Sequence, residues 1–220
     1  MIINIVYEDD DIIVCQKPVG VSSQFSDNEN MLSLLKEQLN LKEMPYVVHR
    51  LDTAVGGLML YSKNKKSASF LSKQISDSQF IKKYYCVVHS KPENKAGTLT
   101  DFLFKDSRKN KSFVVKKERK GVKFASLEYE LLDSVEHREE ILSLMKVTLH
   151  TGRSHQIRVQ FSSRKMPLYG DGKYGGSDNC NIALFSCELC FKNQNNQMMN
   201  FKLAPDGFPW NLFSFEKTFI

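Results

Sequence analysis

The sequence His49-Arg50-Leu51-Asp52 is followed by Gly56-Gly57 and then by Leu58-Met59-Leu60. The apolar run Tyr46-Val47-Val48 stands before it, so a mostly polar quartet separates two strand-like segments. We therefore expect a turn at the edge of a core, where a carboxylate can be partly desolvated and still paired. Taken alone, the quartet fits an Arg–Asp pair that stabilises a turn as well as it fits a functional site.

A second polar cluster lies much further along the chain. It reads Thr151-Gly152-Arg153-Ser154-His155-Gln156-Ile157-Arg158 and follows the strand-like residues 142–149. Two polar clusters on otherwise apolar scaffolding suggest a single site that is built from distant segments.

Together the two clusters resemble the motifs of the RluA-type pseudouridine synthases, which isomerise uridine to pseudouridine in ribosomal and transfer RNA. The resemblance covers nearly the whole chain. Its further matches are Lys17-Pro18-Val19-Gly20, Lys82-Lys83-Tyr84-Tyr85, Met166 to Asp171, Tyr174-Gly175 and a closing strand from Phe201 to Pro205.

Composition sets the broad class of the protein. The 220 residues are 41% hydrophobic and 25% charged, which is ordinary for a globular protein with a full core. The net charge of +6 suits a polyanionic partner. No apolar run is long enough for a transmembrane helix, and the first residues lack the features of a signal peptide. We expect a cytoplasmic monomer that binds RNA and does not bind a membrane.

Strands are expected at residues 2–6, 11–15, 84–88, 99–104, 124–132 and 140–150, and helices at 31–39 and 65–76. This balance predicts an α+β fold with a mainly antiparallel mixed sheet and flanking helices. The resemblance implies that the sheet is bent around a central active-site cleft. We expect one catalytic domain over residues 1–220, without the separate N-terminal RNA-binding domain that many relatives carry.

Residues 105–123 form a basic insertion with nine Lys or Arg residues around Phe113-Val114-Val115. This pattern predicts a hairpin or a flexible arm that follows a phosphate backbone, with Lys116 and Lys117 as RNA contacts. A solvated surface hairpin is the alternative. The Gly- and Asp-rich residues 169–181 are expected to form a loop around the site.

Asp52 falls at the position of the family's catalytic aspartate. The isomerisation breaks the C1′–N1 bond, rotates the uracil and joins C1′ to C5, and an ionised carboxylate can start it. A guanidinium would keep the buried carboxylate charged, and Arg158 matches the family's arginine for that role. Arg153 is a rival partner or a phosphate contact. Arg50 is a possible local partner, although the resemblance favours a role for it on the RNA side, filling the gap left by a flipped base.

Tyr84 matches the family's active-site tyrosine, which can stack on uracil and accept or relay the C5 proton. The adjacent Tyr85 fits a core aromatic better. His49 and His155 are expected to act as hydrogen-bonded scaffold beside the RNA rather than as acid–base groups. Lys82 is a further expected RNA contact.

No metal or organic cofactor is expected. Cys187 and Cys190 have C-x-x-C spacing, but they stand in a strand-like run without a nearby histidine, so buried thiols are the favoured interpretation.

The chain departs from the family pattern after Asp52, where Val55-Gly56-Gly57 replaces the usual Thr-Ser-Gly. Gln160 and Phe185 also replace common histidines. These changes leave a pseudouridine synthase as the leading hypothesis. An inactive RNA-binding or RNA-folding module of the same fold is the alternative, and an N-glycoside hydrolase is a third idea.

Overall fold

The computed structural model describes residues 1–176 and 180–214, which form two compact units. Within this part of the chain, the first unit comprises residues 1–82 and 185–205. The second unit comprises residues 83–176, 180–184 and 206–214. Each unit has its own strands and helices, and each is described by itself below.

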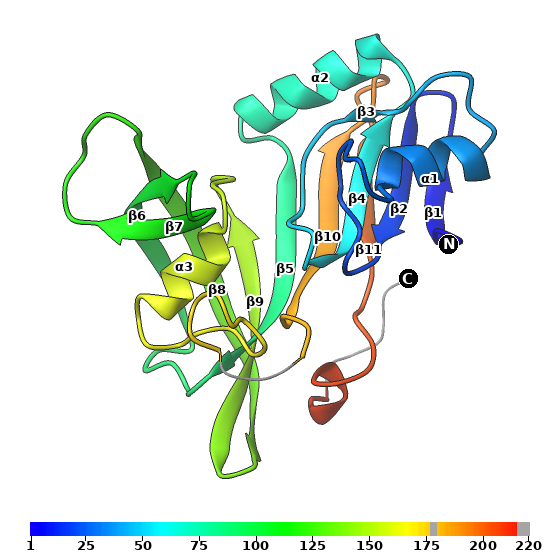
Figure 1. The fold of residues 1–220 in the computed structure, drawn as a ribbon. Helices are drawn as coiled ribbons and strands as arrows, with labels where there is room; N and C mark the ends of the chain where they lie inside the picture. Colours follow the sequence, from blue (N-terminus) through cyan, green and yellow to red (C-terminus); the bar gives the residue numbers. More distant parts are fainter. Residues whose placement is uncertain (177–179, 215–220) are drawn as a thin grey trace. The chain divides into compact units, whose positions relative to one another are not determined.

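The first unit is built on strands paired in the order β1-β2-β4-β10, with β3 paired to β4 and β11 paired to β10 (Figure 1). Their bounds are β1 (Ile5–Glu8), β2 (Ile12–Lys17), β3 (Tyr46–Val47), β4 (Gly56–Ser62), β10 (Leu184–Lys192) and β11 (Met198–Lys202). The pairs are antiparallel except for a short parallel contact between β4 and β10. The β3–β4 connection therefore carries the His49–Asp52 quartet.

Two helices of the first unit begin at asparagine caps. The Oδ1 of Asn30 accepts from the Ser33 amide at the start of α1 (Met31–Gln38), at 3.1 Å. The Oδ1 of Asn64 does the same for the Ser67 amide at the start of α2 (Lys65–Ser76), at 2.9 Å. Such caps satisfy amides that have no partner inside the helix. On α2, Leu71 joins a buried cluster with apolar residues of β2, β4 and β10, so the helix covers one face of these strands.

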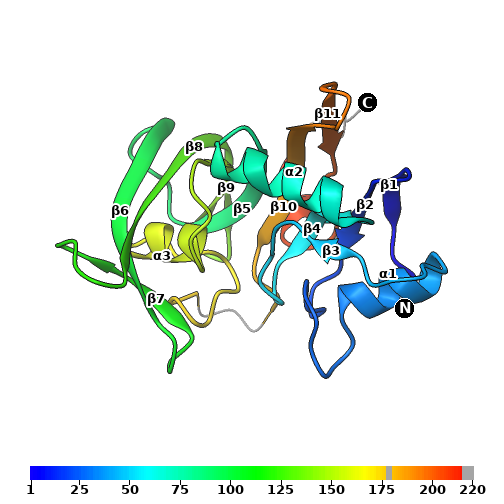
Figure 2. The same cartoon turned by 90° about the horizontal axis from the view of Figure 1, so that it is seen from above.

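The second unit has strands in the order β5-β9-β8-β6-β7 (Figure 2). They are β5 (Ile81–His89), β6 (Ala96–Asp106), β7 (Lys111–Val115), β8 (Val122–His137) and β9 (Glu140–Leu149). The β6–β7, β6–β8 and β8–β9 pairs are antiparallel. The short helix α3 (Gln156–Ser162) contacts β6 and β7. The predicted basic hairpin over residues 105–123 is confirmed, because β7 folds back on β6 and the chain then enters β8.

The predicted α+β class and the mainly antiparallel pairing are confirmed. Both predicted helices are present, but α3 was not expected. It starts inside the polar motif, directly after His155, whose φ is 55°, and its seven residues are too few for a clear periodic pattern. Two strand positions were wrong: the first strand is Ile5–Glu8, and the closing strand is Met198–Lys202, where pairing with β10 sets its limits.

A loop was predicted over residues 169–181. The structure shows turns and irregular chain at residues 169–176 and 180–181, and residues 177–179 lie outside the described residues. Cys187 and Cys190 stand three residues apart on β10 and so point to opposite faces of the strand. The C-x-x-C spacing therefore does not place both sulfurs at one point. None of the helices in the described ranges is long and apolar enough to span a membrane.

Candidate active site

Asp52 stands in a turn that is fixed from several directions within the first unit. The backbone oxygen of Leu51 accepts from Ser23 Oγ at 2.9 Å, and that of Thr53 accepts from the Gly20 amide at 2.8 Å. The amide of Val55 closes the turn on the Asp52 backbone oxygen at 2.9 Å. Asp52 itself is half-buried, whereas its neighbour Leu51 is buried. The loop after β2 and the β3–β4 connection thus hold the carboxylate at a defined position.

Lys17 is the central anchor of this turn. Its side chain is fully buried, and its Nζ donates to the backbone oxygens of Pro18, Val21 and Thr53 at 2.8, 2.8 and 3.1 Å. Three acceptors match the three donors of an ammonium group. Burial lowers the pKa of Lys17 to about 8, and the nearby charge of Asp52 opposes that shift. A buried lysine therefore lies within electrostatic reach of the candidate catalytic carboxylate.

The two other polar residues of the quartet have different surroundings. Arg50 is exposed, and its Nη1 donates to Gln24 Oε1 at 3.1 Å. His49 is buried, and its Nε2 accepts from the Leu60 amide at 3.1 Å. Burial lowers the pKa of His49 to about 3, so the imidazole is neutral. The structure thus shows a scaffold contact for His49, and its contribution to RNA binding stays a prediction.

Gly57 allows β4 to approach β10 closely. Its φ is +116°, and a Cβ at this position would collide with the backbone of Ser186. A side chain is therefore excluded here by both space and backbone conformation. The replaced position Val55 is only 2% exposed, so an apolar side chain fills the interior where the family usually has a hydroxyl.

In the second unit, Arg158 and Asp171 form a buried bidentate pair. Nε of Arg158 donates to Asp171 Oδ2 and Nη2 donates to Oδ1, both at 2.7 Å. The side chains are 9% and 0% exposed. A fork of two parallel charge-assisted bonds fixes the plane of the guanidinium. Asp171 therefore orients Arg158.

Tyr174 connects several parts of the second motif. Its hydroxyl accepts from the Ser112 amide at 2.7 Å and lies 2.9 Å from Nδ1 of His155. Its ring lies under the guanidinium of Arg158, with Cζ 5.1 Å from the ring centroid. Burial raises the pKa of Tyr174, so the hydroxyl stays protonated at neutral pH. One tyrosine thus holds β7, His155 and Arg158 together.

Arg153 and Gln156 fasten the start of α3 to β8. The Oε1 of Gln156 accepts from Thr151 Oγ1 and from the Arg153 amide, at 2.8 and 3.0 Å. Nε of Arg153 donates to the backbone oxygen of Phe124 at 2.8 Å. Arg153 therefore stands beside the basic insertion, a position that suits the phosphate-contact alternative.

The remaining predicted residues lie on β5 and in the insertion. Tyr84 and Tyr85 are both buried, and Lys82 is half-buried with a pKa that burial lowers. Lys116 and Lys117 are exposed after the end of β7. The structure groups Asp52 with Arg50 and His49 in the first unit, and groups Arg158 with Arg153 and His155 in the second.

Three residues that the structure places in these networks had no role assigned from the sequence: Lys17, Asp171 and Tyr174. Each belongs to a segment that matches the family pattern, and that match was the one sign in the sequence that these residues could belong to the site. Nothing local in the sequence predicts that a lysine is fully buried or which arginine a carboxylate binds.

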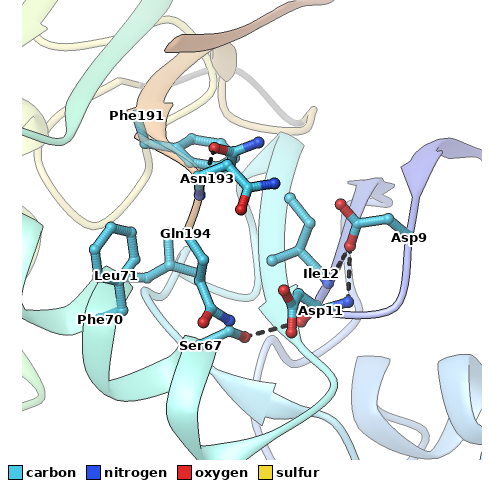
Figure 3. Close-up of a pocket in the computed structure, with 10 residues that line it drawn as sticks. Asp9, Asp11, Ile12, Ser67, Phe70, Leu71, Phe191, Asn193 and Gln194 are labelled. Atoms are coloured by element: carbon cyan, nitrogen blue, oxygen red, sulfur yellow. Dashed lines mark hydrogen bonds between the residues drawn. The ribbon is translucent and has the colours of Figure 1, made fainter. Parts of the chain in front are cut away.

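A small pocket elsewhere in the first unit lies between the β1–β2 turn, α2 and the residues after β10 (Figure 3). Its carboxylates already have partners. Asp9 Oδ1 accepts from the amides of Asp11 and Ile12, both at 2.8 Å, and Asp11 Oδ1 accepts from Asn64 Nδ2 at 2.7 Å. These bonds close the turn, and the pocket contains none of the predicted site residues.

Comparison with known proteins supports the motif analysis. The model of a family described as RNA pseudouridylate synthase matches residues 11–163. An uncharacterized RNA pseudouridine synthase of Aquifex aeolicus is 35% identical over 182 residues, which cover 79% of this chain and 56% of that protein. A ribosomal large subunit pseudouridine synthase D of Borreliella burgdorferi is 33% identical, over 80% of this chain and 56% of its own length. The chain thus spans little more than half the length of these relatives.

Solved structures show the same fold. Human RNA pseudouridylate synthase domain containing 1 aligns with a TM-score of 0.80 at 19% identity, covering 96% of this chain and 86% of the human one. Human RNA pseudouridylate synthase domain containing 4 aligns with a TM-score of 0.75. Since the family model matches more than half of the chain and the motif resemblance is thereby confirmed, this chain belongs to the RNA pseudouridylate synthase family.

Proposed function

We propose that this chain is an RNA pseudouridine synthase that isomerises specific uridines in ribosomal or transfer RNA, with Asp52 as its catalytic carboxylate. The observation that carries the proposal is the family match over residues 11–163, which includes Asp52 and Arg158. Relatives named ribosomal large subunit pseudouridine synthase C and D support ribosomal RNA as one substrate class.

Asp52 starts the reaction at the sugar, either by attack on carbon or by removal of a sugar proton. The C1′–N1 bond then breaks, the uracil rotates, and C1′ joins C5. In that step the bond from carbon to Asp52 breaks, or the abstracted proton returns to the sugar. N1 gains a proton and C5 loses one, so atoms and charge balance without a redox partner. The anchoring of the Asp52 turn by Ser23, Gly20 and Lys17 supports this role, because a reacting group must be held in position.

Arg158 is the proposed partner of the Asp52 carboxylate. Its Nε and Nη2 bind Asp171, and this pair fixes the plane of the guanidinium. A guanidinium can bind two carboxylates through different edges because its five donors point in fixed directions. In this proposal Asp171 is a positioning residue, since it acts through Arg158.

Tyr84 is proposed to stack on the detached uracil and to relay the C5 proton. The uridine must leave its stack before it reaches these groups, at a cost of a few kcal/mol that is smaller in an unpaired loop. Arg50 is exposed and is proposed to fill the space that the flipped base leaves.

The remaining RNA contacts are proposed on basic side chains. Lys82, Arg153, Lys116 and Lys117 contact phosphates, and the last two are exposed on the insertion. His49 and His155 support these surfaces as neutral or hydrogen-bonded scaffold. Phosphate contacts of this kind predict binding that weakens steeply with salt.

The test is direct detection of pseudouridine. Purified protein is incubated with unmodified transcripts of large-subunit ribosomal RNA and with unmodified transfer RNA, and digested nucleosides are resolved by liquid chromatography and mass spectrometry. We expect product from the wild type and from Asp10→Asn, an exposed carboxylate control, and none from Asp52→Asn.

The same assay separates the alternative functions. If the protein binds RNA without forming pseudouridine, and Asp52→Asn does not change that binding, the result supports the inactive RNA-binding module that the altered Val55-Gly56 segment suggested. Free uracil would indicate an N-glycoside hydrolase.

A further inference from the structure

The strand register brings six apolar side chains to one face of β7-β6-β8. Residues that oppose each other directly in antiparallel strands share a face. In the register, Phe102 stands opposite both Val115 and Phe124, and Phe104 stands opposite both Phe113 and Val122. We call these six residues the outer face: Phe102, Phe104, Phe113, Val115, Val122 and Phe124.

The opposite face of the same strands is a core. Leu103 and Ala125 alternate with the outer-face residues and are buried with Val159 and Tyr174. Val159 belongs to α3, which lies beside β6 and β7 (Figure 2). The side chains of the outer face therefore point away from the α3 core.

Solvent reaches the aromatic rings of the outer face. Phe124 is 49% exposed and Phe113 is 38% exposed, and Phe102 meets Phe124 edge-to-face with centroids 6.1 Å apart. Single exposed apolar residues are common on protein surfaces. Here four phenylalanines stand in two adjacent rows of one face, two of them exposed and two half-buried. Grouped apolar side chains of this kind mark interaction sites.

Basic side chains surround these rings. Nζ of Lys111 lies 5.9 Å from the centroid of Phe113, and Cζ of Arg119 lies 5.5 Å from that of Phe104. Arg153 donates to the backbone oxygen of Phe124. Residues 105–123 carry nine basic and two acidic side chains, a net charge of +7. Aromatic faces inside a positive field suit a polyanion that offers flat rings of its own.

We propose that the outer face is a stacking platform for unpaired RNA, a refinement that rests on the proposed function. Bases in a duplex are covered by their neighbours, whereas unpaired bases offer open faces to aromatic side chains. The cations around the platform meet the phosphates between the stacked bases. The platform therefore selects single-stranded segments, the same class of RNA in which a uridine is flipped at least cost.

The test compares two RNA probes on the full chain by fluorescence anisotropy at fixed salt. The probes are a fluorescein-labelled oligouridine of twelve nucleotides and a labelled RNA duplex of twelve base pairs. Phe113→Leu/Phe124→Leu keeps apolar side chains but removes two aromatic faces. We expect its affinity for oligouridine to fall on the order of tenfold, with the duplex affinity changed less than twofold.

Two controls define the effect. Phe113→Tyr/Phe124→Tyr keeps the rings and is expected to bind oligouridine within twofold of the wild type. Phe208→Leu removes a phenylalanine of equal exposure, 48%, outside the platform and is expected to change neither affinity. An equal loss for both probes, no loss for oligouridine, or the same loss in Phe208→Leu would each overturn the platform.

A second measurement needs no variant. Oligouridine that contains 4-thiouridine is photocrosslinked to the wild-type chain, and the crosslinked peptides are mapped. Crosslinks at residues 102–124 support the platform, and crosslinks confined to other segments overturn it. A concentration-dependent dimer of the wild type that disappears in Phe113→Leu/Phe124→Leu, without a change in oligouridine affinity, would instead make the outer face a protein interface.

The outcome is independent of turnover. If the wild type makes no pseudouridine while Phe113→Leu/Phe124→Leu loses oligouridine affinity, the proposed function is refuted and the platform is kept. Wild-type protein that makes pseudouridine, while the leucine variant binds both probes normally, would do the reverse.

Discussion

Asp171→Asn is expected to destabilise the second unit strongly, because it breaks the bidentate ion pair of the buried Arg158. The pair is bidentate, with both bonds at 2.7 Å, and the side chains are 9% and 0% exposed. Removing one partner of a buried ion pair costs about 3–5 kcal/mol. Asparagine keeps one acceptor oxygen, so we expect the lower end of that range, about 3 kcal/mol.

The measurement is urea denaturation followed by circular dichroism, with thermal unfolding as a second readout. For a domain of this size, about 3 kcal/mol corresponds to a fall in Tm of roughly 6–12 °C. The slope of the free energy against urea should stay unchanged, which shows that the variant altered stability rather than the compactness of either state.

Asp101→Asn is the matched control. Asp101 also pairs with an arginine, Arg164, at 2.9 Å, but that arginine side chain is 32% exposed. Water replaces much of what is lost there, so a cost of about 1 kcal/mol or less is expected. A double-mutant cycle of Asp171→Asn with Arg158→Met should give a large coupling energy, since the two substitutions remove the two halves of one buried ion pair. A cost for Asp171→Asn no larger than for Asp101→Asn, or a coupling energy near zero, would contradict this prediction.

Three further predictions concern the first unit. Burial lowers the pKa of Lys17 to about 8, so above that pH the unfolded chain binds more protons than the folded chain. The free energy of unfolding of the wild type, measured by urea denaturation, should therefore rise by up to about 3 kcal/mol between pH 8 and 10.5 relative to Lys17→Met. Burial lowers the pKa of His49 to about 3, so between pH 6.5 and 3 the unfolded chain binds the proton that the folded chain does not. The free energy of unfolding of the wild type should fall by roughly 4 kcal/mol over this range, and His49→Gln should lack most of this loss in the same titration. Gly57→Ala should cost more than about 2 kcal/mol of stability, because the new Cβ meets the backbone of Ser186. Gly20 has φ +91° and open space around it, so Gly20→Ala should cost only about 1 kcal/mol. Equal costs in thermal unfolding would contradict this prediction.

Local patterns in the sequence were sufficient for most of the secondary structure. Apolar residues at helical spacing predict α1 and α2, and alternating or continuous apolar runs predict the strands. The pattern failed at α3, because a helix of seven residues that begins inside a polar motif shows no periodicity that differs from a loop. It was also imprecise at β11, whose limits depend on pairing with β10.

The candidate site divides in the same way. The motif around Asp52 and the one around Arg158 were recognisable, because residue identity and spacing carry that resemblance. The burial of Lys17 under three backbone oxygens was not, since the acceptors come from a loop and from a turn 36 residues away. The pairing of Arg158 with Asp171 likewise depends on how a turn packs against α3.

The family, the α+β class and the positions of the proposed catalytic residues can be predicted from the order of residues along the chain. Which buried charges form pairs and which aromatic side chains share a surface depends on how distant segments pack. The four phenylalanines of the outer face come from three strands, and strand register alone aligns them, since a shift of one residue would turn a strand's side chains to the opposite face. Register is fixed by contacts between residues far apart in the sequence, and no local pattern contains that information.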